Sequence, residues 1–368
     1  MRVLFDHQVF SYQREGGVSR YFAELILGLS VFGIETDTTF RRTTNRYLLE
    51  RFPERFQGWL GGVSFKGKSH LLNIWNQLIS QRKMKTKNWD VFHPTYYNLY
   101  FLRHIKDNPF VLTVHDMTHE RYPEGLSDAK TTPRNKQILA QRAAAIIVVS
   151  ECTKEDLIEI LQVPLNKIFV IHHGISLTPE SIKPVPHTVS EPYWLYVGGR
   201  AAYKNWEAAI LAFRERQKYS PNEHLVHVGG GTWTDSERVM IKKLNVQNKV
   251  FNITATEAQL AWLYQHALGL IYPSKYEGFG LPILEAMAWG CPVICSHSSS
   301  LPEVGGEAAL YFEPDDVQTC LKNMCALDFA ATREKHIQLG LKRSKNFTWK
   351  NSLEKHREVY YTVLGKSS

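Results

Sequence analysis

The chain has 368 residues, of which 43% are hydrophobic and 12% aromatic, and its formal net charge is +8. This composition excludes an intrinsically disordered chain, and the length favours two domains over a single core. No apolar run approaches the ~20 residues of a membrane-spanning helix, and Asp6 comes too early for a secretory signal. Five cysteines without regular spacing favour free thiols in a reducing cytoplasm.

Short β-rich runs alternate with helical patterns in the first half of the chain, which predicts a parallel sheet covered by helices. Strands are expected at residues 2–5, 91–93, 111–115, 145–149 and 168–172. Helices are expected at 18–29 and 131–142. A third helix is expected after Thr153, because Thr153-Lys154-Glu155-Asp156 resembles a capping box.

The segment from 177 to 192 contains four prolines and no apolar periodicity, which predicts a linker. We therefore expect an N-terminal domain at 1–180, a linker at 181–192 and a C-terminal domain at 193–345. The alternation then resumes, with strands at 193–197, 225–228, 268–273 and 292–295 and helices at 206–213, 257–266, 285–290 and 349–363.

Basic residues are concentrated between Arg41 and Asp107, where thirteen Lys or Arg accompany four Asp or Glu. Apolar side chains such as Trp59, Trp75 and Leu78 lie among them. This mixture suits an anionic membrane surface or a lipid-phosphate acceptor. The alternative is a solvated basic face over ordinary core residues. No nucleic-acid-binding motif accompanies the segment, so no nucleic-acid partner is expected.

A glycine turn between an apolar strand and a helix is bracketed by two acids, in the sequence Glu277-Gly278-Phe279-Gly280-Leu281-Pro282-Ile283-Leu284-Glu285. Such a turn presents main-chain N–H groups and the positive end of a helix dipole to an anion, above all phosphate. Glu277 and Glu285 can accept hydrogen bonds from hydroxyls on either side of a bound phosphate. A molecule with hydroxyls flanking a diphosphate is a nucleotide sugar.

Two cations, Arg200 and Lys204, follow the strand expected at 193–197. Ligands of open α/β sheets gather at the carboxyl ends of strands, and these two side chains could neutralise a departing diphosphate without a metal. The alternative is a pair of surface charges in a loop. Cys291, Cys295 and His297 have only a loose zinc-like spacing, and we interpret the cysteines as buried thiols.

In the N-terminal half, Gly16 and Gly17 precede the helix expected at 18–29, where glycines allow a close backbone approach to an anion. They could equally form a simple turn. His115 follows the strand that ends at Val114, at a position suited to a ligand contact, although most lone histidines are structural. His93, His119, His172 and His173 are expected in structural or acceptor-side roles.

The string from Tyr272 to Asp316 resembles the retaining nucleotide-sugar glycosyltransferases of family 4, whose signature is two glutamates separated by seven residues. The continuation is similar as well, through Pro292-Val293-Ile294, Leu301-Pro302-Glu303-Val304 and Tyr311-Phe312-Glu313-Pro314-Asp315-Asp316. The resemblance implies an α/β protein of the GT-B fold, with two Rossmann-like doubly wound domains facing a central cleft. It also implies that the N-terminal domain binds the acceptor and the C-terminal domain the nucleotide sugar, and that the last helix, within 346–368, crosses back to the N-terminal domain.

The resemblance further implies a role for each motif residue. Glu285 would hold the donor ribose, Glu277 the sugar hydroxyls near the reacting carbon, and Gly278, Phe279, Gly280 and Leu281 the phosphates. Arg200 and Lys204 would stabilise charge on the leaving diphosphate, although many family members carry the arginine one position earlier. His115 would reach the transferred sugar, and the loop with Gly16 and Gly17 would lie over the diphosphate.

The function expected from this resemblance is retaining transfer of a hexose to a saccharide or lipid-diphosphate-linked acceptor in polysaccharide biosynthesis. UDP-hexose, such as UDP-glucose, is the favoured donor and GDP-mannose the alternative. No cofactor or metal is expected, and the place of action would be the cytoplasm, at the inner face of the membrane. A sugar-nucleotide 2-epimerase, a glycoside hydrolase and a non-catalytic carbohydrate- or membrane-binding protein are the other hypotheses.

Overall fold

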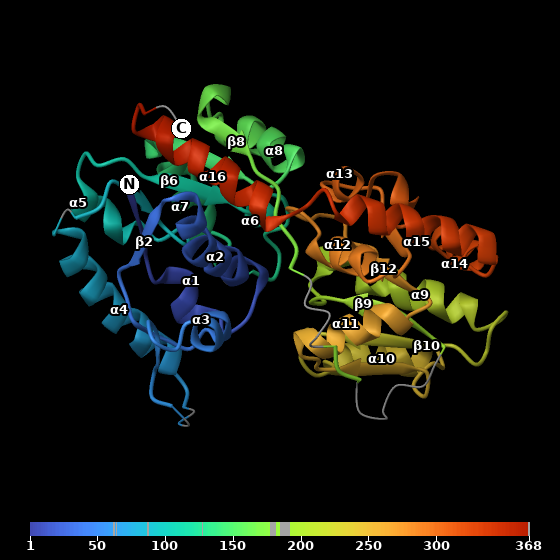
Figure 1. Ribbon diagram of the computed structural model, residues 1–368. Helices are drawn as coiled ribbons and strands as arrows, with labels where there is room; N and C mark the ends of the chain where they lie inside the picture. The colour runs from blue at the N-terminus through green and yellow to red at the C-terminus, as the bar shows by residue number, and fades with distance from the viewer. Residues whose placement is uncertain are drawn as a thin grey trace. The chain divides into compact units, whose positions relative to one another are not determined.

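Two separate α/β units make up the computed structural model, which describes residues 1–61, 63, 65–86, 88–126, 128–176, 182–184 and 192–366. Unit 1 comprises Met1–Gly174 and Trp349–Ser368, and unit 2 comprises Ile175–Thr348 (Figure 1). Most of the linker expected at 181–192 lies outside the described residues. No helix in the described part of the chain is both long and apolar enough to cross a membrane.

Unit 1 is built around β1 (Arg2–Phe5), which pairs in parallel with β2 (Glu35–Thr38) and β5 (Val91–His93). A second parallel set follows in the order β6 (Val111–Val114), β7 (Ala145–Val148) and β8 (Ile168–Val170). A bridge between Phe92 and Phe110 joins the two sets. The direction in which strands are added therefore reverses between β1 and β5, and such reversal points open a crevice for ligands at the carboxyl ends of the strands.

Helices cover the strands of unit 1, and a short pair of strands, β3 (Arg42–Thr43) with β4 (Gln57–Gly58), lies apart from them. The helices are α1 (Gln8–Tyr12), α2 (Gly17–Gly28), α3 (Arg46–Arg51), α4 (Lys68–Met84), α5 (Leu102–Ile105), α6 (Thr118–Arg121), α7 (Thr131–Arg142) and α8 (Glu151–Leu161), with the 3-10 turns η1 (Leu29–Phe32), η2 (Leu99–Phe101) and η3 (Leu165–Lys167).

The start of α8 differs from expectation. Thr153 was expected to cap the helix, but Ser150 is the N-cap residue, and its hydroxyl accepts the N–H of Thr153 at 3.1 Å. The capping box assigned to Thr153 is wrong because Ser150, three residues earlier, is extended and already supplies the side-chain acceptor.

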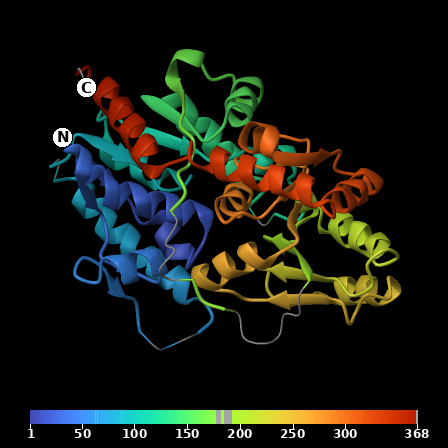
Figure 2. The same cartoon turned by 45° about the vertical axis from the view of Figure 1, so that its right-hand side comes forward.

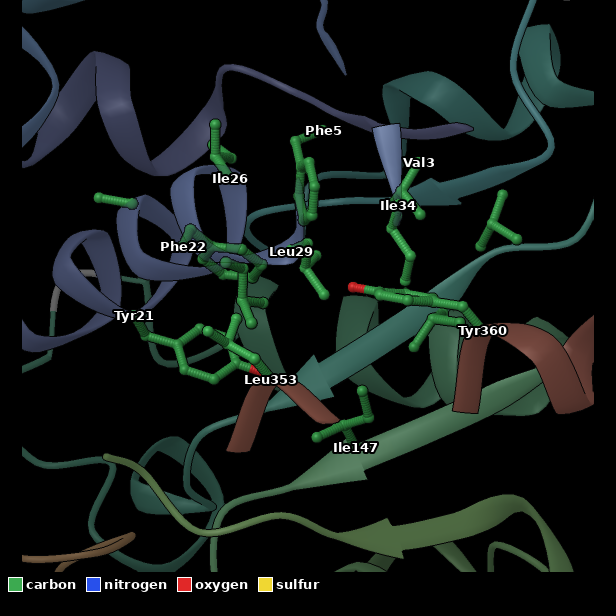
Figure 3. Close-up of a cluster of buried hydrophobic side chains, with 14 of the residues drawn as sticks. Val3, Phe5, Tyr21, Phe22, Ile26, Leu29, Ile34, Ile147, Leu353 and Tyr360 are labelled. Atoms are coloured by element: carbon green, nitrogen blue, oxygen red, sulfur yellow. The ribbon is translucent and has the colours of Figure 1, made fainter. Parts of the chain in front are cut away.

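The C-terminal helix α16 (Trp349–Val363) packs against α2 and η1 of unit 1, and it lies beside the N-terminal helices in both views (Figure 1 and Figure 2). Leu353 and Tyr360 point from α16 into the buried cluster that contains Phe22 and Ile34 (Figure 3). Gly28 of α2 makes room for this contact, because a Cβ at Gly28 would lie 2.3 Å from a methyl carbon of Leu353.

A buried polar network joins α16 to the same sheet. The Tyr360 hydroxyl lies 2.7 Å from Nδ1 of His93, and Nε2 of His93 lies 2.9 Å from Oγ1 of Thr113. Thr113 Oγ1 is also 3.0 Å from the hydroxyl of Tyr21. His356 Nδ1 lies 2.7 Å from a main-chain carbonyl and must donate to it, so Nε2 accepts from the Tyr21 hydroxyl at 2.6 Å. Each of these histidines is therefore satisfied in its neutral form.

Unit 2 contains one parallel sheet of six strands in the order β11, β10, β9, β12, β13, β14. The strands are β9 (Tyr193–Val197), β10 (His224–Val228), β11 (Val250–Ile253), β12 (Gly269–Tyr272), β13 (Val293–Ser296) and β14 (Ala309–Phe312). The helices are α9 (Trp206–Arg216), α10 (Asp235–Lys243), α11 (Glu257–His266), α12 (Leu281–Ala288), α13 (Leu301–Gly305), α14 (Val317–Ala326) and α15 (Ala330–Ser344), with η5 (Ala202–Lys204) and η6 (Gly306–Ala308). The order of addition reverses between β9 and β12, as in dinucleotide-binding sheets.

The buried histidines make the stability of the protein sensitive to acid. Burial lowers the pKa of His356 to about 4, against 6.5 for an exposed histidine. As the pH falls below 6.5, His356 becomes protonated in the unfolded chain but stays neutral in the folded chain. The contribution of this residue to the free energy of unfolding is therefore complete above pH 6.5 and is lost towards pH 4. His356 alone should cost roughly 2 kcal/mol of unfolding free energy at pH 5.

Urea unfolding at pH 7.5 and pH 5 measures this loss. We expect His356→Leu to be less stable than the wild type at pH 7.5 but to lose clearly less stability on acidification. His70→Leu on the exposed face of α4 is the matched control and should keep the wild-type pH dependence. Equal losses in the wild type and in His356→Leu would contradict the prediction.

Candidate functional site

The carboxyl ends of β9 and β12 lie side by side, since these two strands pair in the sheet of unit 2. The segments that follow them are tied together through the main chain. The N–H of Lys275 donates to the carbonyl of Tyr203 at 2.7 Å, and Asn205 Nδ2 donates to the carbonyl of Pro273 at 3.2 Å. Residues 198–205 and 273–277 therefore form one surface at the reversal point of the sheet, although they are distant in sequence.

Lys204 and Glu277 meet at this surface. Nζ of Lys204 lies 2.7 Å from both carboxylate oxygens of Glu277. The hydroxyls of Tyr272 and Ser274 donate to Oε1 of Glu277 at 2.6 and 2.7 Å. Burial raises the pKa of Tyr272, which keeps this hydroxyl protonated and able to donate. Glu277 is only 8% exposed. The hydrogen bonds to Oε1 therefore replace the water contacts that the carboxylate lost on burial.

Oε2 of Glu277 is bonded differently from Oε1. Among the described residues it accepts only from Lys204, whereas Oε1 accepts from three donors. A carboxylate oxygen has room for a further donor in this situation. Oε2 can therefore accept a hydroxyl of a ligand without breaking the contacts that orient the carboxylate.

Two serine hydroxyls shape the turn after Glu277. Ser299 Oγ accepts the N–H of Glu277 at 2.9 Å. Ser300 Oγ lies 2.9 Å from the carbonyls of both Glu277 and Phe279. These contacts come from the segment between β13 and α13, so the turn is held from outside its own sequence. The backbone of the turn is thereby fixed before any ligand arrives.

The turn ends at Gly280, which has a left-handed φ of 106° and is the N-cap of α12. A Cβ there would lie 2.9 Å from a methyl carbon of Leu301, so both the φ angle and the space favour glycine. Helix α12 begins at Leu281 and directs the positive end of its dipole at the turn. The predicted phosphate-binding residues are thus the turn residues Gly278, Phe279 and Gly280 and the first residue of the helix, Leu281.

Glu285 lies one turn further along α12. The hydroxyl of Tyr264 on α11 donates to Oε2 of Glu285 at 3.4 Å. The side chain is partly exposed, which leaves it accessible to a polar ligand. Glu277 and Glu285 thus belong to the same strand–turn–helix unit, and the ribose role of Glu285 stays a prediction.

Arg200 occupies a different place from Lys204. Its guanidinium pairs with Glu237 at 2.6 Å and donates to the carbonyl of Thr232 at 2.8 Å. It also donates to the carbonyls of Gly229 and Gly230 at 3.2 Å each and lies 4.7 Å from the ring centre of Trp233. The structure therefore shows Arg200 holding the glycine loop after β10, while its role at a diphosphate stays a prediction.

In unit 1, Gly16 and Gly17 lie at the start of α2, with Gly16 as the N-cap residue. The side chain of Gln13 covers this helix end: its Oε1 accepts the N–H of Ser19 at 3.2 Å. A Cβ on Gly16 would lie 2.7 Å from that oxygen. The glycine thus gives a side-chain acceptor close access to the first turn of the helix, and approach of a phosphate to Gly16 and Gly17 stays a prediction.

His115 follows β6 and is enclosed by aromatic rings. Its ring lies edge-on to Tyr21 at 4.9 Å and parallel to His173 at 6.0 Å. Burial lowers the pKa of His115 to about 4, so the imidazole is neutral at pH 7. Its Nε2 is buried and has no hydrogen-bond partner among the described residues. A neutral imidazole with one unused nitrogen suits a hydroxyl ligand, and this role stays a prediction.

The other histidines and the cysteines have contacts of their own. His93 belongs to the network around α16, and His119 Nε2 lies 3.0 Å from Asp128. Cys291 and Cys295 are buried free thiols, and burial raises the pKa of Cys291 to about 12. Within the described ranges, no group of three or more His, Cys, Asp or Glu side chains is placed to hold a metal ion.

Sequence reasoning did not single out the residues that orient Glu277. These are Tyr272, Ser274, Ser299 and Ser300. The signal available was a run of three serines, 298–300, directly before the motif that begins at Leu301. Serines after a buried strand are common in loops, so that signal alone would not have identified their partner.

Comparison with known proteins gives two family matches that follow each other along the chain. Residues 15–178 match the model described as "Glycosyltransferase Family 4", and residues 178–324 match the one described as "Glycosyl transferases group 1". The boundary between the two matches falls close to the boundary between unit 1 and unit 2.

Two curated relatives are similar over much of the chain. O-antigen chain mannosyltransferase B of Escherichia coli is 29% identical over 259 residues, which cover 66% of this chain and 67% of that protein. O-antigen chain mannosyltransferase RfbU of Salmonella typhimurium is 30% identical over 227 residues, which cover 60% and 62%. The match thus spans less than two thirds of RfbU.

Among solved structures, sucrose-phosphate synthase from Thermosynechococcus elongatus covers the whole of both chains with a TM-score of 0.77 at 20% identity. At this level of sequence identity, the similarity shows a shared fold and nothing more. The expected α/β architecture of the GT-B type is confirmed.

The contacts of Glu277 predict an asymmetric response to mutation. Lys204→Met leaves a buried carboxylate without its cation and should lower the free energy of unfolding by about 2–3 kcal/mol. Adding Glu277→Gln removes the unpaired charge, so the double variant should be more stable than Lys204→Met alone. The coupling between the two sites follows from urea unfolding of both single variants and the double variant.

Lys275→Met is the matched control, because Lys275 pairs with the exposed Asp315 at 2.8 Å. An exposed pair of this kind should cost less than about 1 kcal/mol. Equal losses for Lys204→Met and Lys275→Met would show that the pair with Glu277 is not buried in solution.

Proposed function

This chain belongs to glycosyltransferase family 4, and we propose that it transfers a hexose from a nucleotide sugar to a saccharide or lipid-linked acceptor in polysaccharide assembly. The observation that carries the proposal is the contact of Lys204 and Glu277 at the reversal point of unit 2, beside the turn that opens α12. The family and its mannosyltransferase relatives support a hexosyltransferase. Because both relatives are named mannosyltransferases, we place GDP-mannose first and UDP-glucose, the donor favoured from sequence, second.

Each polar group at this surface has a proposed task. Glu285 binds the ribose hydroxyls, and the turn at Gly280 with the N-terminus of α12 binds the diphosphate. Oε2 of Glu277 accepts a sugar hydroxyl near the reacting carbon. Lys204 moves between Glu277 and the phosphate oxygens, to which it offers a compact positive charge.

We propose a front-face reaction that retains the configuration of the sugar. The bond between the anomeric carbon and the phosphate oxygen breaks, and the acceptor oxygen bonds to the same face of that carbon. The acceptor proton passes to the departing phosphate oxygen, so no separate base or nucleophile is needed. Lys204, together with Arg200 if the glycine loop opens, stabilises the charge on the diphosphate; loss of one such donor typically costs ~3–4 kcal/mol of barrier. We propose that neither a metal nor another cofactor takes part, and transfer that persists in EDTA would support this.

The donor assignment is tested by thermal unfolding with GDP-mannose, UDP-glucose, UDP-galactose and UDP-N-acetylglucosamine. A ligand present at 100 times its Kd stabilises by about 2.7 kcal/mol, and we expect one nucleotide to produce such a rise. Glu285→Ala should abolish the rise, because the ribose loses its acceptor. Glu334→Ala on the exposed face of α15 is the control and should keep it.

Activity assays with the same donors separate the remaining hypotheses. Transfer of radiolabelled hexose to extracted lipid-linked saccharides supports the transferase. Interconversion of the donor sugar without an acceptor would support a 2-epimerase, and release of sugar from an unactivated glycan would support a hydrolase. Donor binding without turnover of lipid-linked acceptors would support a binding protein. A full melting-temperature rise in Glu285→Ala would refute the ribose assignment.

We further propose that unit 1 contacts an anionic membrane through α4. The buried face of this helix is mixed, with Asn76 and Ser80 beside Leu72 and Met84. Four further apolar side chains are between 44% and 54% exposed: Leu71, Ile74, Trp75 and Leu78. These four lie at i, i+3, i+4 and i+7, which is one continuous helix face.

Polar contacts explain why the amide and hydroxyl face inwards. Asn76 Nδ2 donates to Ser11 Oγ at 3.1 Å and to the carbonyl of Arg42 at 3.0 Å. Ser80 Oγ lies 2.5 Å from Thr39 Oγ1. The buried side of α4 is thus held by hydrogen bonds, which leaves its apolar side for another apolar surface.

Cations lie beside and at the end of the apolar face of α4. The guanidinium of Arg42 lies 5.8 Å from the ring centre of Trp75, and exposed Arg82 and Lys85 lie in the last turn and at the C-cap of the helix. Apolar side chains next to Lys and Arg suit the surface of an anionic bilayer, where the apolar groups enter the acyl boundary and the cations meet the anionic headgroups. We therefore propose that the enzyme works at the cytoplasmic face of a membrane and reaches a lipid-linked acceptor there.

Vesicle co-sedimentation tests this face. We expect binding to phosphatidylglycerol-containing vesicles but much less to pure phosphatidylcholine, with a loss at high salt. Trp75→Glu combined with Leu78→Glu should weaken binding at least about tenfold, since both charges would enter the apolar layer. Val239→Glu, an exposed apolar position on α10 of unit 2, is the control and should bind normally. Undiminished binding by the double variant would contradict the proposal.

A further inference from the structure

A cavity of about 490 Å³ opens at the reversal point of unit 1, where β1 and β5 end. This volume lies in the range of small-molecule sites, and the position matches that of the Lys204 surface in unit 2. The cavity is bounded by the loops after β1 and β5 and by α4 and α7. Its lining residues of interest are His7, Tyr96, Asn98, Asn73, Gln77 and Asn135.

The floor of the cavity is held by a buried carboxylate, Asp6. Its oxygens accept from the N–H and hydroxyl of Thr95 at 2.8 and 2.7 Å, from Gln8 Nε2 at 2.7 Å and from the Tyr100 hydroxyl at 3.1 Å. Gln8 Oε1 in turn accepts the N–H of Asn98 at 2.7 Å. The loops after β1 and β5 are thus locked to each other, and the cavity between them is preformed.

His7 supplies the cavity with an unused polar atom. The residue is 1% exposed, and its Nδ1 lies 3.1 Å from Ser11 Oγ. Nε2 is buried and has no hydrogen-bond partner among the described residues. Burial lowers the pKa of His7 to about 4, so the ring is neutral and Nε2 can exchange a single hydrogen bond with a ligand. A buried polar atom left unpaired costs free energy, which a bound hydroxyl would recover.

Three amides extend this pattern along the walls. Asn73 and Gln77 share one face of α4, and Asn135 lies on α7. All three are partly buried, and none of the three side chains forms a hydrogen bond within the described residues. An amide offers both donors and acceptors, which is what a vicinal pair of hydroxyls requires.

The cavity is nearly free of charge. No Lys or Arg is among the described residues that line it, and the carboxylate of Asp128 is engaged by His119 at 3.0 Å and by the Thr132 hydroxyl at 2.6 Å. Tyr12 and Tyr96 add aromatic surface to the amides. This combination disfavours phosphate and carboxylate ligands, which would lack a cation, and it favours an uncharged polyhydroxyl ring.

A neighbouring groove has the opposite character. It is lined by Arg14, Lys68, Arg46 and Glu50 together with apolar side chains such as Phe65, and it shares Tyr12 with the cavity. Arg46 pairs with Glu50 and Glu15, so Arg14 and Lys68 carry the excess positive charge of the groove. The two hollows are therefore contiguous at Tyr12, one neutral and one basic.

We propose that the cavity at His7 binds one uncharged sugar residue of the acceptor, with the anionic part of that acceptor directed towards Arg14 and Lys68. This inference rests on the proposed function and adds to it the chemical class and the orientation of the second substrate. His7 Nε2 and the amides of Asn73, Gln77 and Asn135 are the groups that contact the sugar hydroxyls.

Saturation-transfer NMR with methyl α-mannoside, methyl α-glucoside and methyl α-galactoside tests the cavity directly, without donor. We expect at least one glycoside to bind, and glucose 6-phosphate to bind at least about fivefold more weakly. Asn135→Leu and Gln77→Leu should each weaken glycoside binding about tenfold, and His7→Phe should weaken it further. The first two replace partly exposed side chains that form no hydrogen bond within the described residues, so they test the cavity even where His7→Phe does not fold.

Gln141→Leu is the matched control, because it lies on the same helix as Asn135 but outside this cavity. It should bind glycosides as the wild type does. Equal binding by Asn135→Leu, Gln77→Leu and the wild type would overturn the proposal, as would stronger binding of glucose 6-phosphate than of every neutral glycoside.

Transfer assays then distinguish this inference from the function on which it rests. If hexose transfer occurs and the acceptor KM is unchanged in Asn135→Leu and Gln77→Leu, the cavity assignment is overturned while the proposed function stands. If no donor supports transfer but glycoside binding follows the variants, the cavity assignment stands and the proposed function fails.

Discussion

The pairing of β9 with β12 is the constraint on which the donor surface depends. It brings a cation from one crossover and a carboxylate from another to the same edge of the sheet, where both side chains are largely buried. A buried ion pair is stabilising only when its remaining hydrogen-bonding capacity is filled. Tyr272 and Ser274 fill that capacity on Oε1 of Glu277, so the pair can exist before a ligand binds.

The same constraint operates in unit 1 with different chemistry. There the reversal lies between β1 and β5, and Asp6 ties the two following loops together by hydrogen bonds from neutral donors. No cation reaches Asp6 in the contacts of the described residues, in contrast to Glu277. One unit thus presents charge at its reversal point, and the other presents amides, hydroxyls and a neutral imidazole.

Sequence patterns predicted the helices and strands that have a clear local signal in their own residues. The bounds expected for 2–5, 131–142 and 257–266 are those of β1, α7 and α11. By contrast, α10 was missed although Thr234 and Glu237 form a capping box that is visible in the sequence. Helix α4 was missed because apolar side chains lie on both of its faces: Leu72 and Met84 are buried beside Asn76 and Ser80, while four other apolar side chains are exposed, so the apolar stripe of an ordinary helix is blurred.

The candidate site shows the same division. The glycine turn and its acids were predictable, since a strand, a turn and a helix follow each other there in the sequence. The contact between Lys204 and Glu277 was not, because it depends on which strands become neighbours. The attachment of Arg200 was not predictable either: three successive glycines at positive φ turn their carbonyls towards one guanidinium, and neither the φ angles nor the partner follows from local pattern.

The contrast between the two hollows of unit 1 bears on how such an enzyme could tell acceptors apart. Attraction between cations and a lipid phosphate acts over several ångströms and is the same for every lipid-linked saccharide. Selection among sugars therefore needs short-range, directional contacts, and a site built to hydrogen-bond a hydroxyl discriminates strongly against a ligand that lacks it. The neutral cavity has such groups in His7 and the three amides, and no cation among its described lining residues competes with them. In this fold the groove would thus supply affinity for the anionic part of the acceptor, and the cavity would supply selectivity for its sugar. Tyr12 lines both hollows and so marks the point where they adjoin.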